Sequence, residues 1–228
     1  MKIRYFLTAA SVSALMIASV AGPATAAEDK LDKLKEQGFA RIAIANEPPF
    51  TAVGADGTVS GAAPDVARAI FEKLGVKEVV ASISEYGAMI PVLQAGRHDA
   101  ITAGLFMKPE RCEAVSYSEP ILCDAESFAL KKGNPLNLQS FKDIADNADA
   151  RIGVPGGGTE EKLALEAGVP RERVIVVPDG QSGIKMLQDG RIDVYSLPVL
   201  SISDLLAKAE DPNLESVAPV VNAPVYCD

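Results

Sequence analysis

The chain has 228 residues, of which 48% are hydrophobic and 23% charged, a balance typical of globular proteins with one large or two small domains. Its formal net charge of −9 argues against nucleic acid or an anionic membrane surface as the main partner. Aromatic residues make up only 5% and tryptophan is absent, so each Phe or Tyr near a predicted site is informative.

The first 26 residues have the pattern of a secretory signal peptide. Lys2 and Arg4 precede an apolar stretch, and residues 24–26 (ATA) form a small-x-small cleavage site. A membrane anchor is the alternative, but the apolar stretch contains Ser and Thr and is shorter than the roughly 20 residues that a span requires. We therefore expect residues 1–26 to be removed and the remaining chain to be exported.

Strand-like and helix-like stretches alternate along the rest of the chain. The predicted order of strand, helix and strand occurs at 41–46 (RIAIAN), 63–75 (APDVARAIFEKLG) and 78–83 (EVVASI), and again at 151–155 (RIGVP), 159–168 (TEEKLALEAG) and 173–178 (RVIVVP). This alternation predicts α/β units with parallel sheets.

A short internal repeat indicates that the chain contains two such sets of strands and helices. Residues 90–101 (IPVLQAGRHDAI) and 184–195 (IKMLQDGRIDVY) both end an amphipathic helix with Leu-Gln-x-Gly-Arg-x-Asp and continue into a strand. We therefore expect an α/β fold of two lobes, with crossovers near 127–134 and 219–226. The expected boundaries are 27–126 for lobe 1, 127–218 for lobe 2 and 219–228 for the return to lobe 1.

An apolar stretch at 99–106 (DAITAGLF) predicts a buried strand, and the following KPER predicts a helix start with Pro109 in its first turn. Phe106 and Arg111 then lie together at the carboxyl end of a strand, where open α/β sheets bind ligands. The planar guanidinium of Arg111 suits a carboxylate. The alternative for Arg111 is an ion pair with an acid of its own helix, Glu110 or Glu113.

A glycine-rich turn before Thr159 (PGGGTEE) predicts a second anion contact. Such a turn leaves backbone N–H groups free at a helix start and lets a ligand come close, although the Gly-Lys-Ser/Thr ending of a P-loop is missing. The alternative for Thr159 is a plain N-cap.

Three aromatic residues lie at the ends of predicted strands of lobe 1: Phe50, Tyr86 and Phe106. Each alone could be a core residue, but together at one cleft they predict a cage for a diffuse cation. Glu47 adds a negative charge beside them, unless it is a loop acid in solvent. The predicted ligand is a compact zwitterion.

Metal and redox chemistry are not indicated. Cys112, Cys123 and Cys227 are an odd number for an oxidising compartment, so one of them is free or pairs outside this sequence, and the pairing stays open. Their spacing matches no metal site, and the one histidine, His98, lies in a predicted turn. We expect no cofactor and no metal.

Several stretches of the chain resemble the periplasmic solute-binding proteins of the polar-amino-acid type, the receptors of ABC importers. The resemblance is carried by 47–70 (EPPFTAVGADGTVSGAAPDVARAI), 90–101, 103–122 (AGLFMKPERCEAVSYSEPIL), 151–163 (RIGVPGGGTEEKL) and 187–195 (LQDGRIDVY). It implies a two-lobed periplasmic-binding-protein fold (type II) with the ligand between the lobes. It also implies a monomeric periplasmic receptor with ABC permease subunits as partners. The family adds a final segment to lobe 1, whereas this sequence stops at Asp228, so we expect lobe 1 to be partly uncovered.

The resemblance also implies roles for single residues. Arg111 holds the position of the family's carboxylate-binding arginine, and Thr159 with the backbone of Gly157 and Gly158 makes the second carboxylate contact. One departure is Lys108, which replaces a threonine of the family's motif.

The second departure is an absent acid. The family's acidic partner for an α-ammonium group does not appear after the second Gly-Arg-x-Asp strand, where Leu197 and Pro198 occur. An ordinary α-amino acid is disfavoured, because burying an unpaired charge costs several kcal/mol.

Among family members, the chain most resembles the receptors for ectoine and hydroxyectoine. This implies that Arg111 and Thr159 bind the ligand's carboxylate, that Glu47 pairs with a ring N–H, and that Phe50, Tyr86 and Phe106 surround the amidinium. A polar or basic amino acid remains the alternative ligand. An alternative of another class is a periplasmic cyclohexadienyl-type dehydratase with Glu47 as general acid, but nothing pairs Glu47 with a second catalytic group, so we expect no enzyme. A sensor domain is a weaker third possibility.

Overall fold

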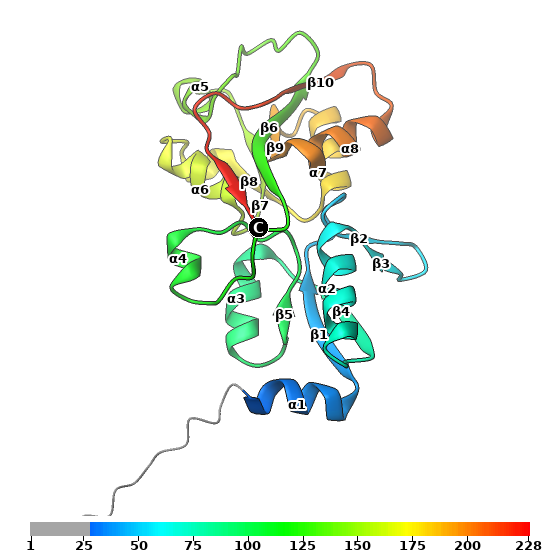
Figure 1. Cartoon of the computed structure of the whole chain (residues 1–228). Coiled ribbons are helices and arrows are strands. Elements are labelled where there is room, and N and C mark those ends of the chain that lie inside the picture. Colours follow the sequence, from blue (N-terminus) through cyan, green and yellow to red (C-terminus); the bar gives the residue numbers. More distant parts are fainter. Residues whose placement is uncertain (1–27) are drawn as a thin grey trace, which may run out of the picture.

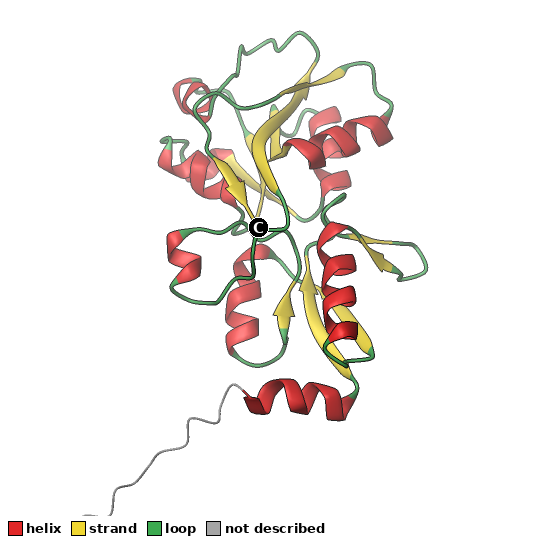
Figure 2. Cartoon of the chain, viewed as in Figure 1, coloured by secondary structure: helices red, strands yellow, loops and turns green. Residues whose placement is uncertain are grey.

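The computed structural model describes residues 28–228, which form two lobes, one below and one above the junction in Figure 1. In both lobes helices flank the strands (Figure 2). The predicted signal peptide lies outside the described residues. No helix in the described part of the chain is long and apolar enough to cross a membrane.

Lobe 1 is built on a three-stranded parallel sheet. Its strands are β1 (Phe39–Ile44), β4 (Glu78–Ile83) and β5 (Ala100–Ile101), in the order β4-β1-β5. The remaining elements are α1 (Glu28–Gln37), the hairpin β2 (Ala52–Val53) and β3 (Val59–Ser60), α2 (Ala62–Lys73), α3 (Tyr86–Gln94) and α4 (Pro109–Cys112).

Lobe 2 has a larger, mixed sheet in the order β10-β6-β9-β7-β8. The strands are β6 (Cys123–Lys131), β7 (Ile152–Pro155), β8 (Val174–Val177), β9 (Val194–Pro198) and β10 (Leu214–Val217). The helices are α5 (Phe141–Asp146), α6 (Thr159–Glu166), the 3-10 turn η1 (Arg171–Arg173), α7 (Gly180–Gln188) and α8 (Val199–Ala209). Strands β7, β8 and β9 are parallel as predicted, whereas β6 and β10 are antiparallel additions at one edge.

The long strand β6 belongs to both lobes. Its first residues, Cys123–Ala125, pair with the short return strand β11 (Val225–Cys227), and the next ones, from Glu126, pair with β9 in lobe 2. A disulfide joins Cys123 to Cys227 at the end of this pairing, and Cys112 is free and exposed. The pairing that the sequence left open is therefore a link between the two strands at the junction of the lobes.

The internal repeat of residues 90–101 and 184–195 corresponds to one kind of turn that occurs in both lobes. In lobe 1 the Asp99 carboxylate accepts hydrogen bonds from the backbone N–H and Nε of Arg41, at 2.9 and 3.0 Å. In lobe 2 the Asp193 carboxylate accepts the same two bonds from Arg151, at 2.9 and 3.1 Å. Arg41 lies near the start of β1 and Arg151 directly precedes β7, and each aspartate follows a helix, so the repeated motif ties a helix end to the neighbouring strand.

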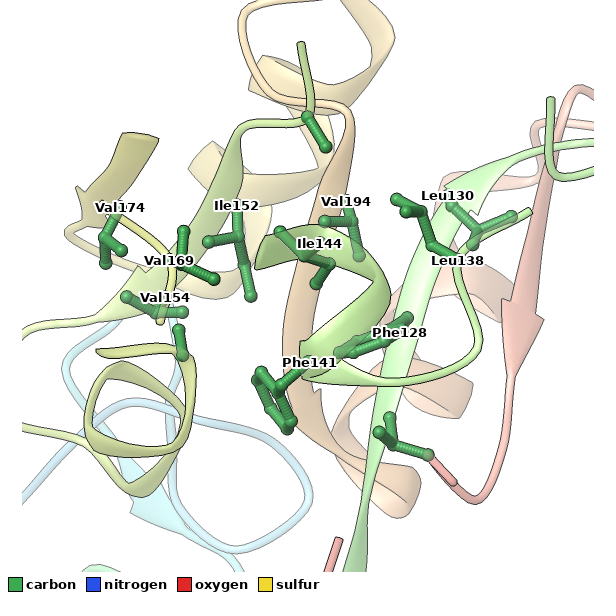
Figure 3. Packing of buried hydrophobic residues seen from close by; sticks show 13 residues of the cluster. Phe128, Leu130, Leu138, Phe141, Ile144, Ile152, Val154, Val169, Val174 and Val194 are labelled. Atoms are coloured by element: carbon green, nitrogen blue, oxygen red, sulfur yellow. The ribbon is translucent and has the colours of Figure 1, made fainter. Parts of the chain in front are cut away.

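Most of the apolar core lies in lobe 2. One cluster gathers under α5 and α6 around Phe128, Phe141, Ile144 and Ile152 (Figure 3), and a second lies under α7 and α8. The clusters of lobe 1 are smaller. On lobe 1, Val66 and Ile70 of α2, its C-cap residue Leu74, and Val80 and Ile83 of β4 are exposed.

One predicted strand is shorter than expected. The stretch 99–106 was predicted as a strand up to its aromatic end, but β5 comprises only Ala100–Ile101. The chain then turns at Gly104, whose φ of 65° is in the left-handed region that favours glycine. A Cβ at this position would lie 2.9 Å from the ring of Phe50, so the turn also makes room for that ring. Phe106 consequently lies in a loop.

Candidate ligand-binding cleft

A small cavity lies between the lobes, beyond the carboxyl end of β1 and at the amino end of α6. It is lined by Glu47, Phe50, Tyr86, Gly104, Phe106, Arg111, Gly158, Thr159, Glu160 and Pro198. Seven of the eight predicted site residues are in this set, and the eighth, Gly157, is the neighbour of Gly158. The free volume is about 20 Å³, room for one water molecule, because side chains of both lobes fill the space.

The aromatic residues come from three segments of lobe 1. Phe50 and Phe106 are 2% and 4% exposed, and their rings meet edge to face with centroids 6.4 Å apart. Tyr86 is the first residue of α3, and its hydroxyl is within 3.0 Å of the Ala103 carbonyl and 3.1 Å of Glu47 Oε2. The three rings therefore line one cavity, as the sequence predicted.

Glu47 is buried, so it is not the solvated loop acid of the alternative interpretation. Its Oε2 accepts a hydrogen bond from Tyr86, and its Oε1 accepts one of 2.8 Å from the Ser201 hydroxyl of α8 in lobe 2. Burial and the charge of Glu160 raise the pKa of Glu47 to about 8, against the lowering effect of these two hydrogen bonds. The carboxyl group thus connects the lobes and is poised to exchange a proton near neutral pH.

Arg111 also reaches across the cleft. Its Nη1 donates to the Phe106 carbonyl at 2.9 Å, and its Nη2 donates to the Gly157 carbonyl of lobe 2 at 3.3 Å. The alternative, an ion pair with Glu110 or Glu113, is not formed: Arg111 donates to these two carbonyls, and the Glu110 carboxylate makes an ion pair with Lys162 of lobe 2. The guanidinium therefore faces neutral carbonyl groups.

The glycine turn brings the two backbones close together. Gly157 has φ of 70°, and a Cβ there would lie 2.4 Å from Cα of Gly87 in lobe 1. The Gly87 N–H donates to the Gly156 carbonyl at 3.3 Å. The close approach of lobe 1 thus requires that residue 157 has no side chain. The sequence did not reveal this reason for a glycine at position 157.

The amide groups of this turn have partners within lobe 2. The Gly157 N–H donates to Glu161 at 2.5 Å, and the Gly158 N–H donates to the Pro155 carbonyl at 3.1 Å. The N-cap of α6 is Gly158, and Thr159 is the first helical residue, so Thr159 is not the N-cap of the alternative interpretation. Its buried side chain lines the cavity instead.

Comparisons with known proteins agree with this architecture. The family model of the bacterial extracellular solute-binding proteins, family 3, matches residues 40–198. This chain belongs to that family. The probable amino-acid ABC transporter periplasmic-binding protein y4tE of Sinorhizobium fredii (strain NBRC 101917 / NGR234) is 36% identical over 204 residues, which are 89% of this chain and 66% of that protein.

A solved structure is closer still. The crystal structure of EhuB in complex with hydroxyectoine is 84% identical, with a TM-score of 0.87 over 88% of this chain and 78% of that one. A more distant relative is an enzyme, the cyclohexadienyl dehydratase of Pseudomonas aeruginosa (strain PAO1), 28% identical over 170 residues, or 74% of this chain and 62% of the enzyme. The predicted two-lobed periplasmic-binding-protein fold is confirmed.

In this family 3 solute-binding protein, the cleft contains acids that sequence analysis missed. Glu160 is 4% exposed and lines the cavity, and Glu126 of β6 is fully buried. Within the described part of the chain, neither carboxylate oxygen of Glu126 has a hydrogen-bond partner. Burial and the charges of Glu160 and Glu47 raise the pKa of Glu126 well above its ordinary value, and burial also raises the pKa of Glu160. An ionised carboxylate only accepts hydrogen bonds, so Glu126 and Glu160 can hydrogen-bond to each other only when one of them carries a proton.

The cationic groups of the solute-binding protein's cleft partly offset these acids. Lys108, the substitution noted in the sequence, is 6% exposed, and burial together with the charge of Arg111 lowers its pKa.

Glu160 could have been predicted, since it directly follows Thr159 at a helix start. Ser201 could not, since it is 154 positions from Glu47 and no motif marks it.

Proposed function

We propose that this chain is the receptor component of an ABC importer and captures ectoine or hydroxyectoine by closing its two lobes on the ligand. The observation that carries the proposal is the 84% identity to EhuB, whose crystal structure contains hydroxyectoine. The geometry supports it, because one cavity combines aromatic faces, a buried carboxyl group and a guanidinium.

The carboxylate of the ligand would bind to Arg111. In the closed cleft this guanidinium donates to two neutral carbonyls, those of Phe106 and Gly157. A carboxylate is the stronger acceptor, since charge-assisted bidentate hydrogen bonds are shorter and about twice as strong as neutral ones. Thr159 adds a hydroxyl group. The Gly157 and Gly158 amides would contribute after the turn releases their present acceptors.

The cationic ring would lie at the opposite end, against Glu47. This carboxylate is already oriented by Ser201 and Tyr86, so it can accept a ring N–H with little loss of freedom. The faces of Phe50, Tyr86 and Phe106 attract a diffuse, weakly hydrated cation, at about 0.5–2 kcal/mol per contact.

Closure of the lobes is the proposed mechanism. The free volume of about 20 Å³ is too small for a ring-sized ligand, so entry requires the lobes to separate. Contacts between the lobes, such as Glu47 with Ser201 and Glu110 with Lys162, would break on opening and form again on closing. The closed receptor would then dock on permease subunits of the importer, in the periplasm.

A basic amino acid is the second candidate ligand. The sequence disfavoured amino acids because the family's acid after the second Gly-Arg-x-Asp strand is absent; there Leu197 is buried in the core and Pro198 lines the cavity. Glu160, however, places a second carboxyl group in the cavity beside Glu47 and could pair with an ammonium group.

We propose a receptor rather than an enzyme, although one relative is a dehydratase. Glu47 has Tyr86 and Ser201 as partners, and the one histidine of the chain, His98, is bonded to Ser82 of β4 and does not line the cavity. Turnover of prephenate or arogenate by the purified protein would contradict this.

Calorimetric titration of the full chain tests the ligand. Ectoine and hydroxyectoine should bind more tightly than arginine, lysine, glutamine or glycine betaine. A cyclic amidinium can contact the aromatic faces and also donate a ring N–H to Glu47, whereas betaine has no N–H to donate and the amino acids bring an α-ammonium group without the family's acidic partner. Tighter binding of arginine or lysine would replace the first candidate by the second.

A further inference from the structure

The ring of Phe106 lies in a segment without regular secondary structure. After β5, residues 102–108 form neither helix nor strand. The Phe106 carbonyl accepts hydrogen bonds from Arg111 at 2.9 Å and from the Tyr117 hydroxyl at 3.3 Å. These bonds hold the backbone but leave the side-chain torsions free, so the orientation of the ring depends on what packs against it.

Outside the cavity, the ring of Phe106 packs against Tyr226 of β11. Its ring stacks on Phe106 with centroids 5.6 Å apart and an interplanar angle of 25°. Lys108 has an extended backbone, with φ of −142° and ψ of 149°, and its ammonium lies 5.2 Å from the centroid of the same Tyr226 ring. The side chains of residues two apart in an extended segment point to the same side, so Phe106 and Lys108 can both contact the Tyr226 ring.

Tyr226 itself is held by a short strand and a covalent link. Strand β11 is three residues long and pairs with β6 only over Cys123–Ala125. The Cys227 carbonyl accepts a 2.7 Å hydrogen bond from the N–H of Met107, the residue after Phe106. The Cys123–Cys227 disulfide joins the strands next to Tyr226. The strand itself is short, and the disulfide adds a covalent restraint on its position to the hydrogen bonds that Asp228 makes with Ile121 and Leu122.

We propose that Tyr226 is a positioning residue of the ligand site: anchored by the Cys123–Cys227 disulfide, its ring keeps Phe106 turned toward the cavity. A Phe106 ring without this support would occupy other rotamers, and the apparent affinity would fall with the fraction of molecules that keep the competent one. The identity of the ligand rests on the proposed function, whereas the orientation of the Phe106 ring does not.

Four variants test the effect on binding, with ectoine as the calorimetric probe. Tyr226→Leu should bind about tenfold more weakly, because the aromatic stack is lost. Tyr226→Phe keeps the stack and should stay within about twofold of the parent. The double variant Cys123→Ser/Cys227→Ser should also lose affinity. Val225→Ala is the matched control, because Val225 is on the same strand, faces the other side and is 65% exposed. Parent affinity in Tyr226→Leu would overturn the proposal.

A second measurement needs no ligand. The protein can be labelled with 4-fluorophenylalanine, and the ¹⁹F signal of Phe106 can be assigned by its loss in Phe106→Leu. This signal should move in Tyr226→Leu and in the double serine variant, and stay in place in Val225→Ala. A Phe106 signal unmoved by Tyr226→Leu would overturn the positioning role. Failure of the parent chain to bind ectoine would instead refute the proposed ligand, and the ¹⁹F spectra would still decide the role of Tyr226.

Discussion

The Ser201 hydroxyl of lobe 2 donates a 2.8 Å hydrogen bond to Glu47 of lobe 1, across the cleft and 154 positions away in the sequence. Both residues are buried. The bond exists only when the lobes are together, so it contributes to closure and also orients the carboxyl group proposed to meet the ligand's cation.

Replacing Ser201 should therefore weaken ligand binding. In Ser201→Ala the closed, liganded form, in which Glu47 is ionised against the ligand's cation, loses a hydrogen bond to a charged group, typically about 1.5–3 kcal/mol, so we expect at least about a tenfold loss of affinity for ectoine by calorimetry. Ser118→Ala is a control, because the exposed Ser118 hydroxyl bonds only to a neighbouring carbonyl of its own segment. Unchanged affinity in Ser201→Ala would mean that this bond does not belong to the liganded form.

The planar fork of Arg111 should matter as well as its charge. Arg111→Ala should lower the affinity for ectoine by at least about tenfold, and Arg111→Lys should restore only part of the loss, because an ammonium group cannot bind a carboxylate with two parallel N–H bonds. Titrations of both variants and of Arg68→Ala, which removes an exposed arginine of α2 paired with Asp65, would check this. Full recovery in Arg111→Lys would reduce the role of the residue to its charge.

The absence of a side chain at Gly157 should be necessary for closure. A Cβ in Gly157→Ala would approach Cα of Gly87 to 2.4 Å, so we expect the lobes to stay further apart and the affinity to fall by more than about tenfold. Gly133→Ala is the matched control, since Gly133 has a similar φ of 80° but no atom within 4 Å of the new Cβ. Equal effects of the two substitutions on affinity would point to backbone strain instead of a blocked cleft. Small-angle scattering with and without ectoine would show whether closure is lost.

Ligand affinity should depend on pH through Glu47. Its pKa is raised from 4.5 to about 8 in the closed, ligand-free cleft, first by burial and then by Glu160, so closing takes up a proton. Protonation therefore stabilises this closed form fully below pH 4.5, and the stabilisation is lost as the pH rises through about 8. A cationic ligand competes with the proton, so the affinity should increase from pH 6 to about 8 and then level off. Calorimetry across this range should show a flat profile for Glu47→Gln; a sloping one would place the titration elsewhere.

Replacing the buried carboxyl group of Glu126 by an amide should stabilise the fold. Burial is the first cause of the raised pKa of Glu126, so the folded state keeps a proton that the unfolded state releases above the ordinary range of a carboxyl group, and the stability falls as the pH rises beyond that range. Glu126→Gln supplies an amide donor for Glu160, and we expect about 1–3 kcal/mol of added stability at pH 7.5 and little change at pH 4. Urea unfolding at both pH values, with the exposed Glu172→Gln as control, measures this. A destabilised Glu126→Gln at pH 7.5 would show that the carboxylate has a favourable partner.

Local sequence patterns predicted most of the fold. Alternating strands and helices were placed within a few residues of β1, α2, β4, β7, α6 and β8, because apolar periodicity and glycine positions act over one element at a time. The strand predicted over 99–106 was wrong beyond Ile101, because the chain turns away at Gly104 to make room for Phe50.

The predicted site residues were found together, although their contact with a ligand stays a prediction. Phe50, Tyr86, Phe106 and Arg111 line one cavity with the α6 turn. Each follows a strand or begins a helix at the same sheet edge, and this relation can be inferred from the order of elements.

The sequence alone determined the two α/β lobes, the cleft at their strand ends, and the kinds of groups that line it: rings, a guanidinium and a carboxyl. Only the tertiary structure decided which groups meet. Ser201 bonds to Glu47, Tyr226 stacks on Phe106, and Cys123 pairs with Cys227. These contacts join segments more than 100 positions apart, and they depend on how closely the lobes and the return strand pack, which no periodicity within a single element encodes.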